Sequence, residues 1–448
     1  MSRSVLLVVA LAAVITVSNA AMCSGKPDPH AQPNLNPIYT EPPKFVKSAT
    51  NGKLYTVGTG DDQINVVHVW GTPYDWGHAQ GTLLKDTAAK MINDVWGYLE
   101  AQVEEAVNKT IHFSPAAQKL IADVGLDAAL DLTYDATKKY SGSYFFEEMR
   151  GLADAAGVDY KTVRRIHMIG ELTKGACSMF GAWGNATKST GSTLQLRALD
   201  WDVDGPFKDF PQITVYHVTN ASLGHDFINI GWTGWLASIT GLSSTQMGIS
   251  EIGVTFPDKT FGSESRFGVP FAFLLRDILQ FDETLDDSIN RMSNSKRTCD
   301  LILGVGDAKI PGGFRSAAYS GSHIEFYDDK NMKPVADWHQ RIDDLVYYGM
   351  DWLCPAYSEV LGAQLLKYYG NITAENAVRD IIAITQTGNL HIAIYDLTNQ
   401  VFYTSNARAS YETGPFNAYQ RQFIKVDAAK LFAETAPTVT GGEGQVVA

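Results

Sequence analysis

The spacing of apolar residues changes along the chain, from a helical period in the first third to an alternating period afterwards. Between residues 82 and 108 apolar positions recur every three or four residues with charged residues between them, which is typical of an amphipathic helix. Similar patterns predict helices near residues 115–138, 144–156 and 160–172. This part of the chain is therefore predicted to be mostly helical.

After Gly175 apolar and polar residues alternate, as expected for β-strands, and Gly and Asn separate the alternating runs. Strands are predicted over residues 192–201, 210–219, 226–240 and 314–327, with a hairpin of 389–396 and 400–405 and two earlier strands within 54–70. Helices are predicted near residues 270–280, 283–293, 357–369 and 374–384. These elements predict a layered α+β fold in which helices pack on antiparallel sheets.

The first twenty residues have the pattern of a signal peptide. Arg3 precedes an apolar run over residues 5–17, and small residues follow at positions 18–21. The run is shorter than the roughly 20 apolar residues that a transmembrane helix needs, which argues against a membrane anchor. We therefore expect cleavage after Ala20 and a mature protein that is secreted or lysosomal.

A proline-rich leader over residues 21–43 follows the signal peptide and is expected to be extended, and residues 436–448 are expected to be loose. Four N-x-S/T triplets are predicted glycosylation sites, which fits the secretory route. Their acceptors are Asn108, Asn185, Asn220 and Asn371. Four cysteines are too few to build the fold from disulfides, although Cys299 and Cys354 are candidates for one pair.

Composition and charge favour a globular protein that does not bind nucleic acid as its main task. Of 448 residues, 45% are hydrophobic and only 19% are charged. The chain carries 36 Lys and Arg against 49 Asp and Glu, a formal net charge of −13. Neutralisation of nucleic-acid phosphates requires clustered cations instead.

Common catalytic and cofactor motifs are absent from the sequence. There is no G-x-S-x-G, H-E-x-x-H or C-x-x-C, and the nearest serine-hydrolase string, GISEIG over 248–253, misses by one residue. The ten histidines never fall at metal-ligand spacing, and the GVGD string at 304–307 lacks the rest of a dinucleotide or phosphate loop. We therefore expect neither a metal nor a cofactor.

A cysteine with a nearby arginine and aspartate is the remaining candidate for chemistry. Cys177 lies where the helical pattern changes to strand, and Arg197 and Asp200 follow about twenty residues later in a strand pattern. A cation favours the thiolate that acts as a nucleophile, and a base must take the thiol proton. Cleavage before Cys177 would supply its own α-amino group as that base, with Asp200 orienting it. The structural alternative is a buried or disulfide-bonded cysteine beside an Arg197–Asp200 salt bridge.

Three sequence blocks resemble the acyl-coenzyme A:6-aminopenicillanic acid acyltransferase-like group (C45 peptidase type) of N-terminal nucleophile hydrolases. They are VWGTPYDWGHAQG at 69–81, EMRGLADAAGV at 148–158, and the GACS string at 175–178 followed by R-x-x-D-W at 197–201. The R-x-x-D step is similar to that of bile-salt hydrolases, penicillin V acylases and acid ceramidase. The blocks run from about residue 66 to 205, and weaker likeness continues to about residue 408.

This resemblance implies an αββα sandwich and autocatalytic cleavage between Ala176 and Cys177. Cleavage would divide one integrated unit into a mostly helical chain, 44–176, and a nucleophile-bearing chain, 177–448, which stay associated. By the same resemblance Cys177 is the nucleophile, Arg197 holds the thiolate and Asp200 binds the freed amine.

The resemblance is less complete for the later site residues. The family's asparagine for the oxyanion is not visible, and Asp351 falls near its place. Backbone N–H groups, or another amide such as that of Asn389, would have to replace it. Arg408 resembles a late family arginine that helps to close the site, and a surface arginine is the alternative.

Together these features predict a hydrolase of a non-peptide C–N amide with a fatty or other apolar acyl group. Trp232 and Trp235 could line the acyl pocket, although tryptophans in strands more often pack in a core. His391 and Tyr395 are expected to be half-buried structural residues. The alternatives are an acyltransferase to another amine, and a secreted glycoprotein that binds ligand on the same fold without catalysis.

Overall fold

The computed structural model describes residues 25–104, 112–113, 121, 124–408, 414 and 416–438. The predicted signal peptide and the Asn108 acceptor lie outside the described residues. Among these residues, no helix combines the length and the apolar character that crossing a bilayer requires.

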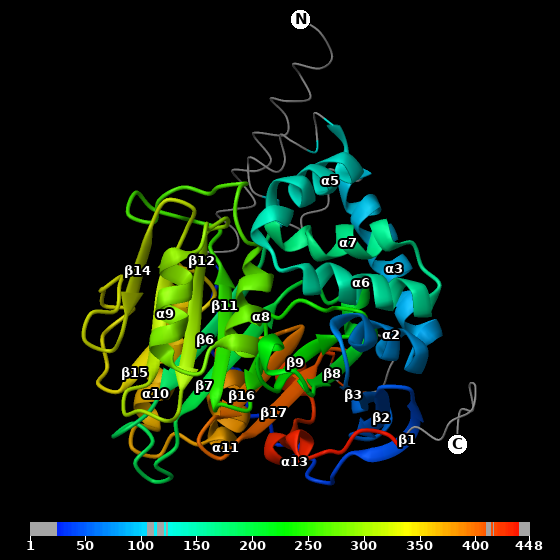
Figure 1. The fold of residues 1–448 in the computed structure, drawn as a ribbon. Helices are drawn as coiled ribbons and strands as arrows, with labels where there is room; N and C mark the ends of the chain where they lie inside the picture. Colours follow the sequence, from blue (N-terminus) through cyan, green and yellow to red (C-terminus); the bar gives the residue numbers. More distant parts are fainter. Residues whose placement is uncertain are drawn as a thin grey trace, which may run out of the picture.

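Two stacked β-sheets form the centre of the molecule (Figure 1). The larger sheet contains, in spatial order, β1 (Lys44–Ala49), β2 (Gly52–Val57), β3 (Ile64–Val69), β8 (Pro211–Tyr216), β9 (Phe227–Trp232), β10 (Gly241–Ser243), β11 (Met247–Gly253), β12 (Leu301–Asp307), β13 (Phe314–Tyr319) and β14 (Ile324–Tyr327). The smaller contains β15 (Leu345–Tyr348), β6 (Ala176–Ala182), β7 (Leu194–Asp200), β16 (His391–Asp396), β17 (Val401–Asn406) and β18 (Ile424–Asp427). A short third sheet pairs β4 (His112–Phe113) with β5 (Thr173–Lys174).

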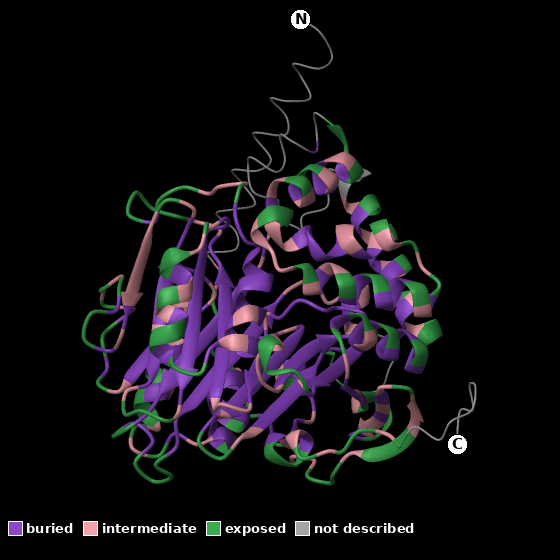
Figure 2. Cartoon of the chain, in the orientation of Figure 1, coloured by how far each residue is buried: buried purple, intermediate pink, exposed green. Residues whose placement is uncertain are grey.

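Helices cover the outer faces of both sheets. The larger sheet carries α8 (Phe271–Phe281) and α9 (Leu285–Asn294), and the smaller carries α10 (Pro355–Lys367), α11 (Ala374–Asn376), a π-helical turn (Ala377–Ile382) and α12 (Ala383–Thr385). The short helix α13 (Ala428–Phe432) follows β18. Most strands between these layers are buried, whereas the edge strands β1 and β14 are largely exposed or half-buried (Figure 2). This arrangement confirms the predicted α+β class and the αββα layering.

The N-terminal helices are α2 (Pro73–Leu83), α3 (Lys85–Glu104), α5 (Leu126–Thr137), α6 (Ser143–Ala156) and α7 (Tyr160–His167). The pattern over 82–108 predicted a single helix, but the helix is interrupted at Leu84, between the end of α2 and the start of α3. The strand predicted over 226–240 ends at Trp232, because Gly234 turns the chain with a φ of 78°. Such a positive φ suits glycine, which has no Cβ.

Two of the sequence blocks that carry the family resemblance meet at the crossing of α2 and α6. A Cβ on Gly77 would lie 1.9 Å from the Glu148 carbonyl oxygen, and a Cβ on Gly151 would lie 2.1 Å from that of Tyr74. Only glycine permits this close approach of the two backbones. At the same crossing Oε2 of Glu148 lies 2.6 Å from Nη2 of Arg276 in α8, and both side chains are fully buried. These blocks therefore fix the helical layer to the larger sheet.

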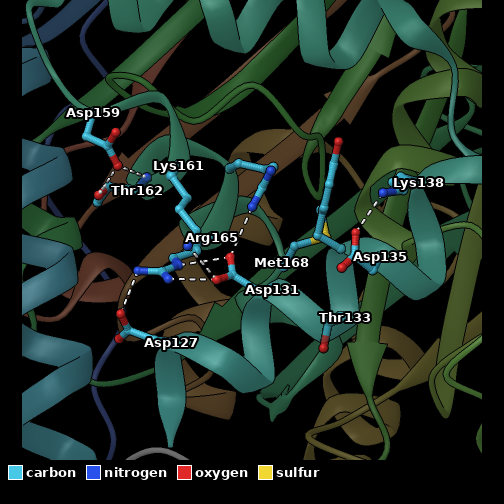
Figure 3. A network of polar contacts seen from close by, with 12 residues as sticks. Asp127, Asp131, Thr133, Asp135, Lys138, Asp159, Lys161, Thr162, Arg165 and Met168 are labelled. Carbon is cyan, nitrogen blue, oxygen red and sulfur yellow. Dashed lines mark hydrogen bonds and ion pairs between the residues drawn. The ribbon is translucent and has the colours of Figure 1, made fainter.

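Ion pairs join α5 to α7 at the outer side of this layer (Figure 3). The Arg165 guanidinium lies 2.7 Å from a carboxylate oxygen of Asp127 and 2.7 Å from one of Asp131. Lys161 approaches Asp131 at 2.9 Å. Hydrogen bonds from Arg165 hold the pKa of Asp131 well below its usual range, although burial acts in the opposite direction.

Residues 25–43 of the leader lie against the half of the chain that follows Cys177. The side-chain amide of Asn34 donates to the carbonyl oxygens of Tyr419 at 3.0 Å and Arg421 at 2.8 Å. Nearer the N-terminus, the Asp28 N–H donates to Oε1 of Gln386 at 2.7 Å. Hydrogen bonds therefore tie the leader to segments near α12 and β18.

The predicted pairing of Cys299 with Cys354 is wrong. Cys354 is disulfide-bonded, whereas Cys299 is free and buried. The Cys299 thiol donates to the carboxylate of Glu171 at 3.4 Å, inside the core. Sequence spacing could not exclude the pair, because it carries no information on the direction in which each side chain points.

Candidate active site

Cys177 and Arg197 lie on neighbouring strands of the smaller sheet. In the register of β6 and β7, Cys177 is paired with Leu199, and Met179 with Arg197. Cross-strand partners share a face, so the Cys177 and Arg197 side chains both point toward the larger sheet. Nη1 of Arg197 lies 3.5 Å from Sγ of Cys177. The thiol is only 1% exposed, and the structure thus brings two predicted site residues into direct contact.

Glu251 of β11 completes this contact from the opposite sheet. Its carboxylate forms a hydrogen-bonded ion pair with Nη2 of Arg197, whose side chain is fully buried. The Arg197 Nε donates to the Ile239 carbonyl at 3.3 Å. Burial raises the pKa of Glu251, and the nearby guanidinium acts in the opposite direction. The pair fixes the Arg197 side chain so that one nitrogen faces the thiol.

Asp200 lies at the end of β7, opposite Ala176 in the strand register. Its carboxylate accepts hydrogen bonds from Oγ1 of Thr387 at 2.7 Å, from the Gly388 N–H at 2.8 Å and from the Asn389 N–H at 3.0 Å. Burial raises the pKa of Asp200 to about 6, although these hydrogen bonds lower it. The Ala176–Cys177 peptide bond therefore lies beside a carboxylate that three donors hold in place.

In the uncut chain the Cys177 thiol is neutral at physiological pH. Burial raises the pKa of the thiol to about 12, and Arg197 lowers it only in part. The Cys177 N–H donates to the Met350 carbonyl at 3.3 Å. A cut before Cys177 would turn this peptide nitrogen into an amine with one acceptor already in place.

An apolar cavity of about 90 Å³ reaches the site at Gly175, Leu199 and Glu251. Trp232 and Trp235 line it, and both are also buried in the core. The other lining residues are Tyr98, Leu99, Ile169, Gly170, Thr173, Trp201, Phe207, Ile239, Gly253, Phe271, Leu301 and Leu390. Residues from both sides of the Ala176–Cys177 bond therefore form this cavity.

The structure places Asp351 near the site and Arg408 away from it. Asp351 follows Met350, and its carboxylate accepts hydrogen bonds from the backbone N–H groups of Thr255, at 2.8 Å, and Trp352. Burial raises the pKa of Asp351 to about 6. Arg408 lines a separate cavity of about 610 Å³, and its guanidinium donates to the Asp61 carbonyl.

Asn389 presents an amide donor beside the Asp200 loop. Its Oδ1 accepts a hydrogen bond from the Trp201 N–H at 2.8 Å. This contact fixes the side chain with its NH₂ group as the remaining polar end. Among the described residues that NH₂ group donates to no protein acceptor.

Sequence reasoning missed Glu251, Thr387 and Met350. Glu251 lies within the GISEIG string, which was considered only for its serine. Nothing local to these residues marks them as functional, because each reaches the site through the fold. His391 and Tyr395, which were expected to be half-buried, are both fully buried.

Three of the predicted glycosylation acceptors, Asn185, Asn220 and Asn371, are exposed. Glycosylation of these residues stays a prediction. Within the described part of the chain, no group of three or more His, Cys, Asp or Glu side chains could hold a metal ion.

Comparisons with known proteins identify two relatives that cover most of the chain. Protein dcd1A of Dictyostelium discoideum is 37% identical over 452 residues, which cover 96% of this chain and 99% of that protein. Protein dcd1B of the same organism is 33% identical over 415 residues, which cover 90% of this chain and 81% of that protein. No protein-family model matches the chain.

Solved structures with a similar arrangement share little sequence with this chain. An N-acylethanolamine-hydrolyzing acid amidase ortholog of Caenorhabditis elegans gives a TM-score of 0.39 at 11% identity, over 55% of this chain and 98% of that one. Penicillin V acylase from Agrobacterium tumefaciens gives a TM-score of 0.38 at 10% identity, over 57% of this chain and 87% of that one. A mutant of the conjugated bile acid hydrolase from Clostridium perfringens gives a TM-score of 0.36 at 12% identity, over 60% of this chain and 97% of that one.

Proposed function

This chain belongs to the family of the dcd1A and dcd1B proteins of Dictyostelium discoideum, and from its own site we propose that it is a self-processing cysteine amidohydrolase. It cuts itself between Ala176 and Cys177 and then cleaves a non-peptide amide with an apolar acyl group. The protein acts after secretion or in the lysosome, without a metal or a cofactor. The 3.5 Å contact between Arg197 and the Cys177 thiol carries the proposal.

Self-cleavage begins with attack of the Cys177 sulfur on the Ala176 carbonyl carbon. The C–N bond breaks, the nitrogen takes up the thiol proton, and the Ala176 acyl group is left as a thioester on Cys177. Water then hydrolyses the thioester and gives an Ala176 carboxylate, a free thiol and a free α-amine. Residues of both resulting chains line the cavity, and in this proposal the two chains stay associated.

Substrate cleavage uses the new α-amine as the base. Such an amine normally titrates near ~7.7–8.0, so it can take and return a proton at neutral pH. It accepts the thiol proton, and the thiolate, stabilised by Arg197, attacks the substrate carbonyl carbon. The ammonium then protonates the departing amine, and water hydrolyses the acyl-thioester to a carboxylic acid and free enzyme.

The cavity defines the acyl side of the substrate. Its lining is mainly aliphatic and aromatic, with Trp232 and Trp235 among its walls. Burial of apolar surface stabilises a bound acyl chain by about 25 cal/mol per Å². These features favour an amide with an apolar acyl group, whose polar amine part would remain outside the apolar walls.

Replacing Asn389 with alanine is expected to lower kcat by about 10²–10³-fold, because the Asn389 NH₂ group is the proposed oxyanion donor. The backbone N–H that supports Asp200 remains in this variant. Asn389→Asp is the matched control, since it keeps an acceptor for the Trp201 N–H but loses the donor. Single-turnover hydrolysis of a fluorogenic fatty acyl amide measures both variants, and wild-type rates in both would exclude Asn389 as the donor.

The proposed function is tested on the purified wild-type protein under reducing conditions. Intact masses and N-terminal residues should show two chains, the second of which begins with Cys177. The cut protein should then react at Cys177 with an acyl-type electrophile and hydrolyse members of a panel of fatty amides. A chain that stays whole at every pH from acid to neutral would refute the proposal, and a cut chain that hydrolyses no amide would favour ligand binding without catalysis.

A further inference from the structure

Thr387 connects Ser178, the residue that follows Cys177, with Asp200, which lies opposite Ala176 in the strand register. Its Oγ1 lies 2.6 Å from Oγ of Ser178 and 2.7 Å from Oδ2 of Asp200, and the side chain is fully buried. The Ser178 Oγ in turn accepts the Met350 N–H at 3.0 Å. The Met350 carbonyl accepts the Cys177 N–H at 3.3 Å. A continuous relay therefore runs from Cys177 to Asp200.

The number of hydrogens fixes the direction of this relay. A hydroxyl group has a single hydrogen to donate, and an ionised carboxylate only accepts. Since the Met350 N–H donates to Ser178, the Ser178 hydrogen is free to go to Thr387, and the Thr387 hydrogen goes to Asp200. Each hydroxyl thus uses its only hydrogen toward the carboxylate, which stabilises the ionised form of Asp200.

We infer that Thr387 is a positioning residue for the free amine of Cys177, acting together with Ser178. The relay holds the Met350 carbonyl and the Asp200 carboxylate as the acceptors of the new ammonium group. This inference rests on the proposed self-cleavage, because the amine exists only after the cut.

Loss of the Thr387 hydroxyl would weaken Asp200 as a partner for the amine. The Asp200 carboxylate would lose one of its three donors in a buried place, so its pKa would rise. At a given acid pH more of Asp200 would then be protonated. The α-amine is already protonated at that pH, and the charge of Asp200 raises the pKa of the Cys177 thiol, so losing that charge favours the thiolate. The other charged or titratable groups that act on Asp200 are Arg197 and Cys177 of the smaller sheet, Tyr357 of α10 and Tyr419.

The rate at which iodoacetamide alkylates Cys177, followed against pH by mass spectrometry, tests the inference without a substrate. In Thr387→Val the acid limb of this profile should move to lower pH by about one unit, which is about tenfold faster alkylation on that limb. Thr387→Ser retains a hydroxyl and should restore the wild-type profile. Thr385→Val is the matched control, because Thr385 is equally buried but its hydroxyl donates to the Ile381 carbonyl.

The outcomes separate this inference from the proposed function. A wild-type chain that is not cut at Cys177 overturns both. A cut and reactive wild type with an unchanged profile in Thr387→Val overturns only the role of Thr387. If Thr387→Val does not fold, Ser178→Ala breaks the same relay one bond earlier, and a wild-type profile in that variant overturns the inference. A shifted profile in either variant, with Thr387→Ser and Thr385→Val unshifted, supports it.

Discussion

Replacing Cys177 with alanine is expected to abolish both self-cleavage and amide hydrolysis. The sulfur is the attacking atom in both reactions, so no residual route through Arg197 or Asp200 remains. Loss of a nucleophile typically lowers kcat by on the order of 10⁵-fold or more. The chain should still fold, because alanine fits where the small, buried Cys177 side chain was. Intact mass should show a single uncut chain, and single-turnover assays should show no acyl-thioester.

Cys299→Ala supplies the control for this variant. Cys299 is also free and buried, but its thiol contacts Glu171 rather than an arginine. Its loss should leave both the cut and the hydrolysis unchanged. A Cys177→Ala chain that is still cut at position 177 would show that another protease makes the cut.

The sequence was sufficient to predict the part of the site that lies on adjacent strands. Arg197 and Asp200 follow Cys177 closely in sequence, and β6 and β7 form one antiparallel strand pair. Alternation of side chains along the strands then brings Arg197 to the thiol.

The rest of the site could not be predicted because it reaches Cys177 only through the stacking of layers. Glu251 comes from the opposite sheet, and Thr387 comes from a loop that follows α12. Met350 acts through its backbone, and its side-chain type has no bearing on that contact. Arg408 shows the reverse case, in which a residue type in a suitable sequence position lies elsewhere in the fold.

The helical layer shows the same division between local and distant information. Apolar periodicity predicted the positions of most helices, but not the close crossing of α2 and α6. That crossing depends on Gly77 and Gly151, whose role is visible only when the facing backbones are in place. The first two of the three blocks are therefore largely structural, and the proposed chemistry lies in the third block.

Breaking the Arg197–Glu251 pair is expected to cost both stability and activity, and the two effects can be separated. Removal of one partner leaves the other as a buried, uncompensated charge, which typically costs about 3–5 kcal/mol of folding free energy. Arg197→Met and Glu251→Leu should each show this loss, whereas the double variant should recover most of it. Urea unfolding measures these changes, with every variant made in the Cys177→Ala background so that all chains remain uncut.

Activity should not recover in the double variant when Cys177 is present. An apolar pair can restore packing between β7 and β11, but it provides no cation to stabilise the thiolate. A double variant that is stable yet neither cuts itself nor hydrolyses amide would therefore show that Arg197 has a chemical role beyond structure. Recovery of self-cleavage together with stability would instead show that the ion pair only holds the two sheets together, and the proposed role of Arg197 at the thiol would be lost.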